Sequence, residues 1–171
     1  IAFAAPTTTI TVNPVEWNGA VLNPFLPNLI INASIEGGDI IKAGTGVLRL
    51  NGANAWTGNF DLQSGGLLLG NNSALSGGTL TIGNNTFLSS TADNRIIAND
   101  FTISGDFALK DAFNLTMNGA STLAAGNHTI SVDLATKSLT LGGILTGAGS
   151  ITKAGDGILV LNNNSNAYTG A

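Results

Sequence analysis

Hydrophobic and polar residues alternate along most of the chain in short runs, and most runs are followed directly by Gly or Asn. The clearest runs are residues 79–82, 101–104, 114–117, 128–134 and 138–141. A period of two places every second side chain on the same face, which is typical of half-buried β-strands. No segment shows the i, i+3, i+4, i+7 spacing of an amphipathic helix. The pattern therefore predicts an all-β chain with almost no helix.

Two segments of the chain are near copies of each other. Residues 40–58 read IIKAGTGVLRLNGANAWTG, and residues 151–170 read ITKAGDGILVLNNNSNAYTG. The matched positions are Lys42, Gly44, Gly46, Leu48, Leu50, Trp56 and Gly58 in the first copy, and Lys153, Gly155, Gly157, Leu159, Leu161, Tyr168 and Gly170 in the second. We expect the glycines to flank turns, the leucines to face the core, and the aromatic residue to pack over the edge of the core.

The offset of 111 residues between the copies corresponds to about five units of roughly 22 residues, a period typical of solenoids. We predict a parallel, right-handed β-helix (β-solenoid) of about seven coils, stacked about 4.8 Å apart into a rod about 35 Å long. Asn and Thr side chains at equivalent turns are expected to hydrogen-bond along the stack. An antiparallel β-sandwich is the alternative, disfavoured because two-residue hairpin signals do not recur at regular spacing.

The two copies resemble the passenger-associated transport repeat, also called the autotransporter-associated β-strand repeat. In that family a Lys-x-Gly-x-Gly turn precedes an alternating Leu strand and then Asn-x-aromatic-Thr-Gly. The resemblance covers most of the chain after about residue 30. It implies a β-helix, a role in passage to the cell surface, and membership of large secreted or surface-exposed bacterial proteins. Members usually continue beyond the point where this chain ends, and no membrane barrel follows here, so we expect the N-terminal piece of a longer passenger or a processed unit.

The first thirty residues lack the repeat pattern. Residues 1–4 have the small-x-small form of a signal-peptidase site and are interpreted as a signal-peptide remnant. Residues 5–30 are interpreted as an N-terminal cap of the solenoid formed by residues 31–171. Alternatively they hold a free donor strand that adds to a neighbouring subunit. The candidate residues for strand addition are Thr9, Ile10, Thr11 and Val12.

Composition excludes several partner classes. Charged residues make up 9% of the chain and its net charge is −4, with no basic cluster, so we expect no binding to nucleic acid. There are no cysteines, which excludes disulfides and thiolate metal sites. No apolar run reaches the roughly 18–20 residues of a membrane span, so we expect no membrane insertion by this segment.

The residues that could carry chemistry are scattered. His128 is the single histidine and is interpreted as a surface strand residue, while Lys42 and Lys153 are interpreted as solvated turn residues. The aspartates lie mostly in turns, where they are expected without any function. We therefore predict no catalytic, cofactor-binding or metal-binding residues, no cofactor, and no enzyme.

Three functions remain open. The first is a structural solenoid segment of a secreted or cell-surface protein that supports export and display. The second is an adhesin or a self-assembling filament subunit, which uses strand addition or end-to-end stacking. The third is a carbohydrate-active β-helix enzyme, which would need three or more charged side chains gathered in one groove. Expected partners are another copy, the rest of a longer passenger, or a host or cell-surface carbohydrate or protein.

Overall fold

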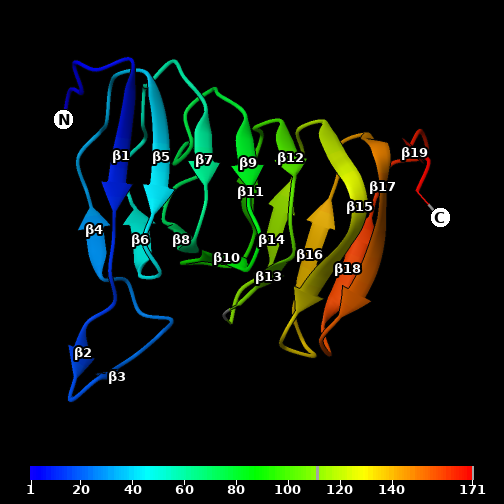
Figure 1. Cartoon of the computed structure of the whole chain (residues 1–171). Helices are drawn as coiled ribbons and strands as arrows, with labels where there is room; N and C mark the ends of the chain where they lie inside the picture. Colours follow the sequence, from blue (N-terminus) through cyan, green and yellow to red (C-terminus); the bar gives the residue numbers. More distant parts are fainter. Residues whose placement is uncertain (111, 171) are drawn as a thin grey trace.

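The computed structural model describes residues 1–110 and 112–170, and these form a parallel β-solenoid of about seven turns without a helix. Successive coils follow one another along the rod, with the two termini at opposite ends (Figure 1). This confirms the predicted all-β solenoid. Residues 111 and 171, which fall inside the predicted solenoid range 31–171, lie outside the described residues.

Three walls of parallel strands enclose the core. The first wall contains β1 (Thr7–Thr11), β5 (Asp39–Ala43), β7 (Phe60–Leu62), β9 (Leu80–Ile82), β12 (Phe101–Ile103), the first parts of β15 (Ser121–Val132) and β17 (Leu145–Ala154), and β19 (Ala167–Tyr168). The second wall contains β4 (Leu29–Ile31), β6 (Val47–Leu50), β8 (Gly65–Leu69), β10 (Thr86–Ser90), β13 (Phe107–Leu109) and the later parts of β15 and β17. The third wall contains β11 (Arg95–Ile97), β14 (Leu115–Met117), β16 (Ser138–Leu141) and β18 (Ile158–Leu161).

The length of a coil can be read from the strand register. Along the first wall Ile40 pairs with Phe60, then Leu80, Phe101, Ser121 and Leu145 follow in turn, so these coils take 20 to 24 residues. The first coil is longer, because Thr8 pairs with Ile40, 32 residues later. Its extra residues form the antiparallel hairpin of β2 (Glu16–Trp17) and β3 (Ala20–Val21), which projects away from the rod at the lower left of Figure 1.

The two sequence copies are not separated by a whole number of coils. Five rungs beyond Lys42 on the first wall lies Gly147, six residues before Lys153. The first copy therefore begins on the first wall, whereas Lys153 pairs with Ile130 on the second wall. The prediction of five equal units is wrong because the coils lengthen toward the C-terminal end of the rod. The same strand–turn–strand unit fits at either corner.

The core consists of aliphatic columns that run along the rod. Leu48, Leu67, Leu88, Leu109 and Val132 pair in succession along the second wall, and each is at most 2% exposed. Each such side chain contributes roughly 1.5–3 kcal/mol through burial. The alternation of the sequence places them inward, as predicted.

The N-terminal region differs from both interpretations of residues 5–30. Strand β1 is not free, since it pairs in parallel with β5, and Val12 is buried in the core. The solenoid thus begins upstream of the boundary predicted at residue 31. Residues 1–3 run beside residues 34–36, joined by an isolated bridge between Ala2 and Glu36. Whether residues 1–4 remain from a signal peptide stays a prediction.

Candidate functional site

The turn of the first repeat is built around a buried lysine. Lys42 is fully buried, and its Nζ donates to the carbonyls of Ala43 at 3.0 Å, Gly44 at 2.7 Å and Ser64 at 2.9 Å. Gly44 has a φ of +76°, a conformation that favours glycine, and directs the chain so that both local carbonyls meet the ammonium. The prediction of a solvated turn is wrong for Lys42. Its position two residues after the buried Ile40 was the signal that it points inward.

Burial also changes the acidity of this amine. Removal from water disfavours the charged form and lowers the pKa of Lys42 to about 8. The carbonyl of Ser64 belongs to the next coil along the chain, so the ammonium links two coils as well as closing its own turn.

The second repeat reproduces the local half of this arrangement. Lys153 Nζ donates to the carbonyls of Ala154 at 2.6 Å and Gly155 at 2.7 Å, and Gly155 has a φ of +73°. Lys153 is exposed, as predicted, because no coil of the described residues lies over it. The turn geometry is therefore a property of the repeat, and the burial of its lysine depends on the next coil.

Other repeat residues bind the preceding coil. The amides of Gly46 and Gly157 donate to the carbonyls of Val12 and Val132, each at 2.8 Å. The Oδ1 atoms of Asn54 and Asn166 accept from the amides of Ile35 and Leu145, each at 2.8 Å.

Asn54 additionally binds the coil that follows. Its Nδ2 donates to the carbonyl of Ala74 at 2.7 Å, so one buried side chain joins three coils. Asn54 and Asn166 match in the alignment of the copies, which was the sequence signal for this role. They belong with the repeat residues that position successive coils.

The aromatic position lies deeper than predicted in the first repeat. Trp56 is 1% exposed within the core and packs against Phe60 at a ring-centroid distance of 5.9 Å, so the prediction that it covers the edge of the core is wrong. Tyr168 is partly buried against the same core. Gly58 and Gly170 each lie directly over the backbone of the preceding coil.

The leucines also differ between the copies. Leu48 and Leu50 are fully buried, whereas Leu159 is partly buried and Leu161 is 37% exposed. The inward prediction fails for Leu161 because it lies in the last described coil.

The residues predicted for strand addition lie in the first rung of the solenoid. Thr9, Ile10 and Thr11 pair with Ile41, Lys42 and Ala43, and the Val12 amide donates to the Ala43 carbonyl at 2.9 Å. Among the described strands, β1 pairs only with β5, so its other edge is the end of the first wall.

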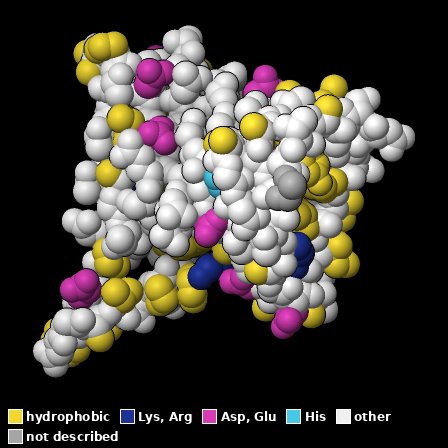
Figure 2. All heavy atoms as spheres, turned by 45° about the vertical axis from the view of Figure 1, so that its right-hand side comes forward, with side chains coloured by type: hydrophobic (Ala, Val, Ile, Leu, Met, Phe, Trp, Pro, Cys, Tyr) yellow, Lys and Arg dark blue, Asp and Glu magenta, His cyan; other side chains and the backbone are white. Residues whose placement is uncertain are grey.

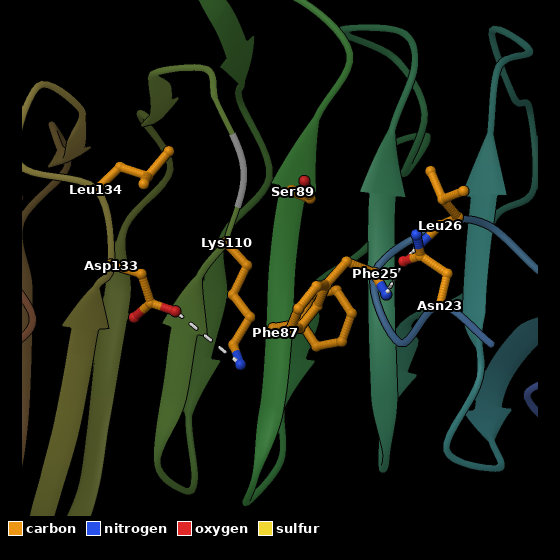
Figure 3. Close-up of a pocket in the computed structure, with 8 residues that line it drawn as sticks. All are labelled: Asn23, Phe25, Leu26, Phe87, Ser89, Lys110, Asp133 and Leu134. Carbon is orange, nitrogen blue, oxygen red and sulfur yellow. Dashed lines mark hydrogen bonds and ion pairs between the residues drawn. The ribbon is translucent and has the colours of Figure 1, made fainter. Parts of the chain in front are cut away.

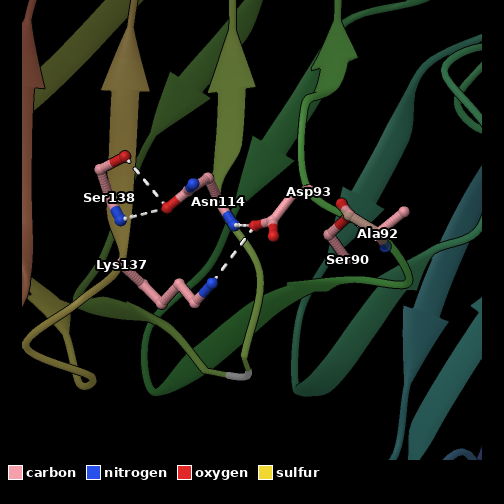
Figure 4. Close-up of polar contacts among 6 residues, drawn as sticks. All are labelled: Ser90, Ala92, Asp93, Asn114, Lys137 and Ser138. Atoms are coloured by element: carbon pink, nitrogen blue, oxygen red, sulfur yellow. Dashed lines mark hydrogen bonds and ion pairs between the residues drawn. The ribbon is translucent and has the colours of Figure 1, made fainter.

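Polar side chains form ladders at the corners, as predicted for the turns. The Asn59 amide donates to Asp39 Oδ1 at 2.8 Å, and the Thr79 amide donates to Asn59 Oδ1 at 3.0 Å. At another corner Asp93 accepts from the Asn114 amide at 2.9 Å, and Asn114 Oδ1 accepts from the Ser138 amide at 2.9 Å (Figure 4).

Asp93 combines this ladder with an ion pair. Its Oδ1 lies 3.4 Å from Lys137 Nζ. The hydrogen bond from the Asn114 amide and the nearby ammonium together lower the pKa of Asp93. An aspartate in this turn is explained by coil-to-coil bonding alone.

His128 is a buried residue rather than the predicted surface residue. It is 6% exposed, and its Nε2 lies 2.9 Å from the Ala124 carbonyl. It shares the parity of the buried Ile130 and Val132, which was the signal for an inward orientation.

The charged side chains do not gather as an enzyme site would require. A groove on the second wall holds Lys110 and Asp133, and a neighbouring groove holds Asp106 and Lys110. Each joins one carboxylate to one ammonium, short of the three charges that the enzymatic alternative needs. Among the described residues no group of three or more His, Cys, Asp or Glu side chains could hold a metal ion, and no helix is long and apolar enough to cross a membrane.

Comparison with known proteins gives one family. Residues 40–73 and 151–171 match the model of the passenger-associated transport repeat. No curated protein and no solved structure gives a significant match to the chain. The two matched segments contain the lysine turns and the asparagine bridges described above.

Proposed function

This chain carries two passenger-associated transport repeats, and we propose that it is a structural β-solenoid segment of a secreted or surface-exposed bacterial passenger. In this proposal the segment supports export and surface display and has no catalytic role. The repeat match and the solenoid fold support the passenger assignment.

The observation that carries the export role is the two-sided bonding of each coil. A repeat binds the preceding coil through Gly46 and Asn54, and it offers Lys42 Nζ and Asn54 Nδ2 to the following coil. A chain that emerges from a membrane as an unfolded thread can therefore fold one coil at a time on a ready template. Each folded coil is too wide to slide back, so folding drives the chain outward.

Surface display of a tagged fusion tests this proposal. The chain is placed between a signal peptide and an autotransporter barrel, and the exposed fraction on intact cells is measured with an added protease. The double variant Gly44→Val and Gly155→Val replaces residues at positive φ, where an added Cβ would come within 2.4 Å of the Val12 and Val132 carbonyl oxygens. We expect the exposed fraction to fall several-fold.

The matched control is Gly77→Val, because a Cβ at Gly77 meets no atom within 4 Å. This variant should be displayed like the wild type. Circular dichroism of the purified chains establishes which variants fold. Equal display of an unfolded double variant would refute a role of repeat folding in export.

A second candidate is a filament subunit or an adhesin, favoured by the outer edge of β1, which pairs with no described strand. A neighbouring subunit could add a strand there, and an adhesin would bind a surface carbohydrate or protein with the exposed walls. Negative-stain electron microscopy of the chain beside a version without residues 1–12 tests assembly. Fibres from the full chain alone would support it, and short rods from both would exclude it.

A further inference from the structure

A second hydrophobic cluster lies on the outside of the solenoid. Val47, Leu68 and Phe87 point away from the core, yet they are at most 8% exposed, and Ala108 packs against them. Outward side chains on a solenoid wall are expected to face water. Something on the molecule therefore covers this part of the second wall.

The cover is residues 14–28, here called the N-terminal arm. The Asn28 amide donates to the Val47 carbonyl at 2.9 Å, and the Val47 amide donates to Asn28 Oδ1 at 2.8 Å. The Phe25 ring meets the Phe87 ring edge-on at a centroid distance of 5.9 Å, and Lys110 Nζ lies 4.8 Å from the Phe25 centroid. The base of the arm is thus fixed to the wall.

Beside Phe25 the cover stops and leaves a groove of about 390 Å³ (Figure 3). Phe25 and Leu26 of the arm form one side, and Phe87 and Leu134 of the body form the floor and the far side. Lys110 lies between Phe87 and Asp133, with its Nζ 4.0 Å from Asp133 Oδ2. The groove is apolar with a charged rim.

The tip of the arm is an apolar hairpin that packs on nothing. Trp17 pairs with Ala20, and the Leu22 amide donates to the Val15 carbonyl, so Val15, Trp17 and Leu22 share one face. These three side chains are 56%, 71% and 63% exposed. Figure 2 shows hydrophobic side chains spread along this projecting segment. An apolar surface of this kind marks an interaction site.

We propose that the hairpin face formed by Val15, Trp17 and Leu22 docks in the groove of a second copy, giving a two-fold symmetric dimer. Phe25 and Leu26 belong to both the arm and the groove, so the protruding surface and its receptor lie side by side on one molecule. Such a patch is self-complementary, and two copies can exchange arms in one closed contact. No contact to a third copy is then left open.

Charge also favours a second copy as the occupant. The single charged residue of the arm is Glu16, and the cation at the groove is Lys110, so approaching copies present opposite charges there. Segments that lie on lipid surfaces are rich in Lys and Arg, whereas the arm has neither and the chain carries a net charge of −4. A membrane is therefore the weaker candidate.

Sedimentation equilibrium of the purified chain tests self-association. We expect a dimer that is weakened at least about 30-fold by the double variant Trp17→Ser and Leu22→Ser, the effect of removing an aromatic hot spot. Ile96→Ser, which changes an exposed residue of the third wall, should leave association unchanged. The arm lies outside the core, so the unfolding midpoints of all variants should match. A monomer at every concentration, or a dimer insensitive to the double variant, would overturn the proposal.

Disulfide trapping tests the docking geometry, since the chain has no native cysteine. Leu22→Cys and Leu134→Cys are made as separate proteins and mixed under mild oxidation. We expect the mixed disulfide to form faster than either homodimer. Preferential Leu22→Cys homodimers would instead show hairpin-to-hairpin packing, and binding to phosphatidylcholine vesicles without self-association would identify a lipid partner. Either result would reject docking in the groove.

Discussion

At the scale of single residues, Lys42 is fully buried and holds three carbonyls, whereas its counterpart Lys153 is exposed. Replacing Lys42 by Met leaves the Gly44 and Ser64 carbonyls without this donor. We expect a loss of about 2–4 kcal/mol in the free energy of unfolding, since an unsatisfied buried group costs about 1–3 kcal/mol. Lys153→Met should change stability by no more than about 0.5 kcal/mol. Urea unfolding at pH 7 measures both, and equal effects would contradict the proposed role of the next coil.

The pH dependence of the same pair gives an independent check. Lys42 has a pKa of about 8 in the folded chain against 10.5 for an unperturbed lysine. Between these values the unfolded chain binds more protons, so the wild type gains stability relative to Lys42→Met as the pH rises, and below pH 8 the difference is constant. A wild-type advantage that falls over this interval would show that the amine is not depressed.

Trp56 is buried, but its Nε1 has no hydrogen-bond partner among the described residues. Trp56→Phe removes the unsatisfied donor and keeps most of the packing against Phe60, so we expect a cost below about 1.5 kcal/mol. Trp56→Ala should cost about 3–5 kcal/mol, because it leaves a cavity. Both are measured by urea unfolding. A Phe variant as unstable as the Ala variant would mean that Nε1 does have a partner, such as a buried water.

At the scale of the strands and coils, Asn54 joins three coils through the Ile35 amide and the Ala74 carbonyl, and both of these residues are fully buried. Asn54→Ala should cost about 2–4 kcal/mol, because two buried backbone groups lose their partners. Asn166→Ala removes one such bond and should cost about 1 kcal/mol. Comparable losses in the two variants would show that the second coil contact carries no stability.

Sequence periodicity predicts the strands well because burial dictates it. Leu48 and Leu50 face inward as the alternation requires, and the turns fall at glycines of the repeat. The same rule, applied to Lys42 and His128, would have placed both inside, but their polarity outweighed their parity in the prediction. The rule also reveals the hairpin, since Asn18 and Gly19 both have positive φ, as a two-residue Asn-Gly turn requires.

What the sequence does not contain is the packing of parts that touch only in three dimensions. The groove brings together Phe25, Phe87 and Leu134, which are far apart in the chain and share no motif. Likewise the unequal coils, which move the second repeat to another wall, follow from the bend in β15 rather than from any repeated residue. Such features depend on tertiary packing, which no local pattern specifies.

At the scale of the whole molecule, each coil contacts mainly its neighbours, so stability should vary along the rod rather than follow one global value. Strands β7 to β10 are largely buried, whereas β18 and β19 are exposed or half-buried. In the chain of residues 1–171, amides of β18 should exchange with solvent at least about 30-fold faster than those of β8, because local opening there exposes less buried surface. Hydrogen exchange read by mass spectrometry measures this gradient.

The Asn54→Ala variant turns the gradient into a test of coil-by-coil assembly. If coils are held mainly by their neighbours, this change should raise exchange in β5 to β8 and leave β14 and β16 near their wild-type rates. If the rod is one cooperative unit, exchange should rise equally in every strand. The second outcome would remove the physical basis for folding on a growing template, because a partly emerged chain would then gain no stability until the last coil was in place.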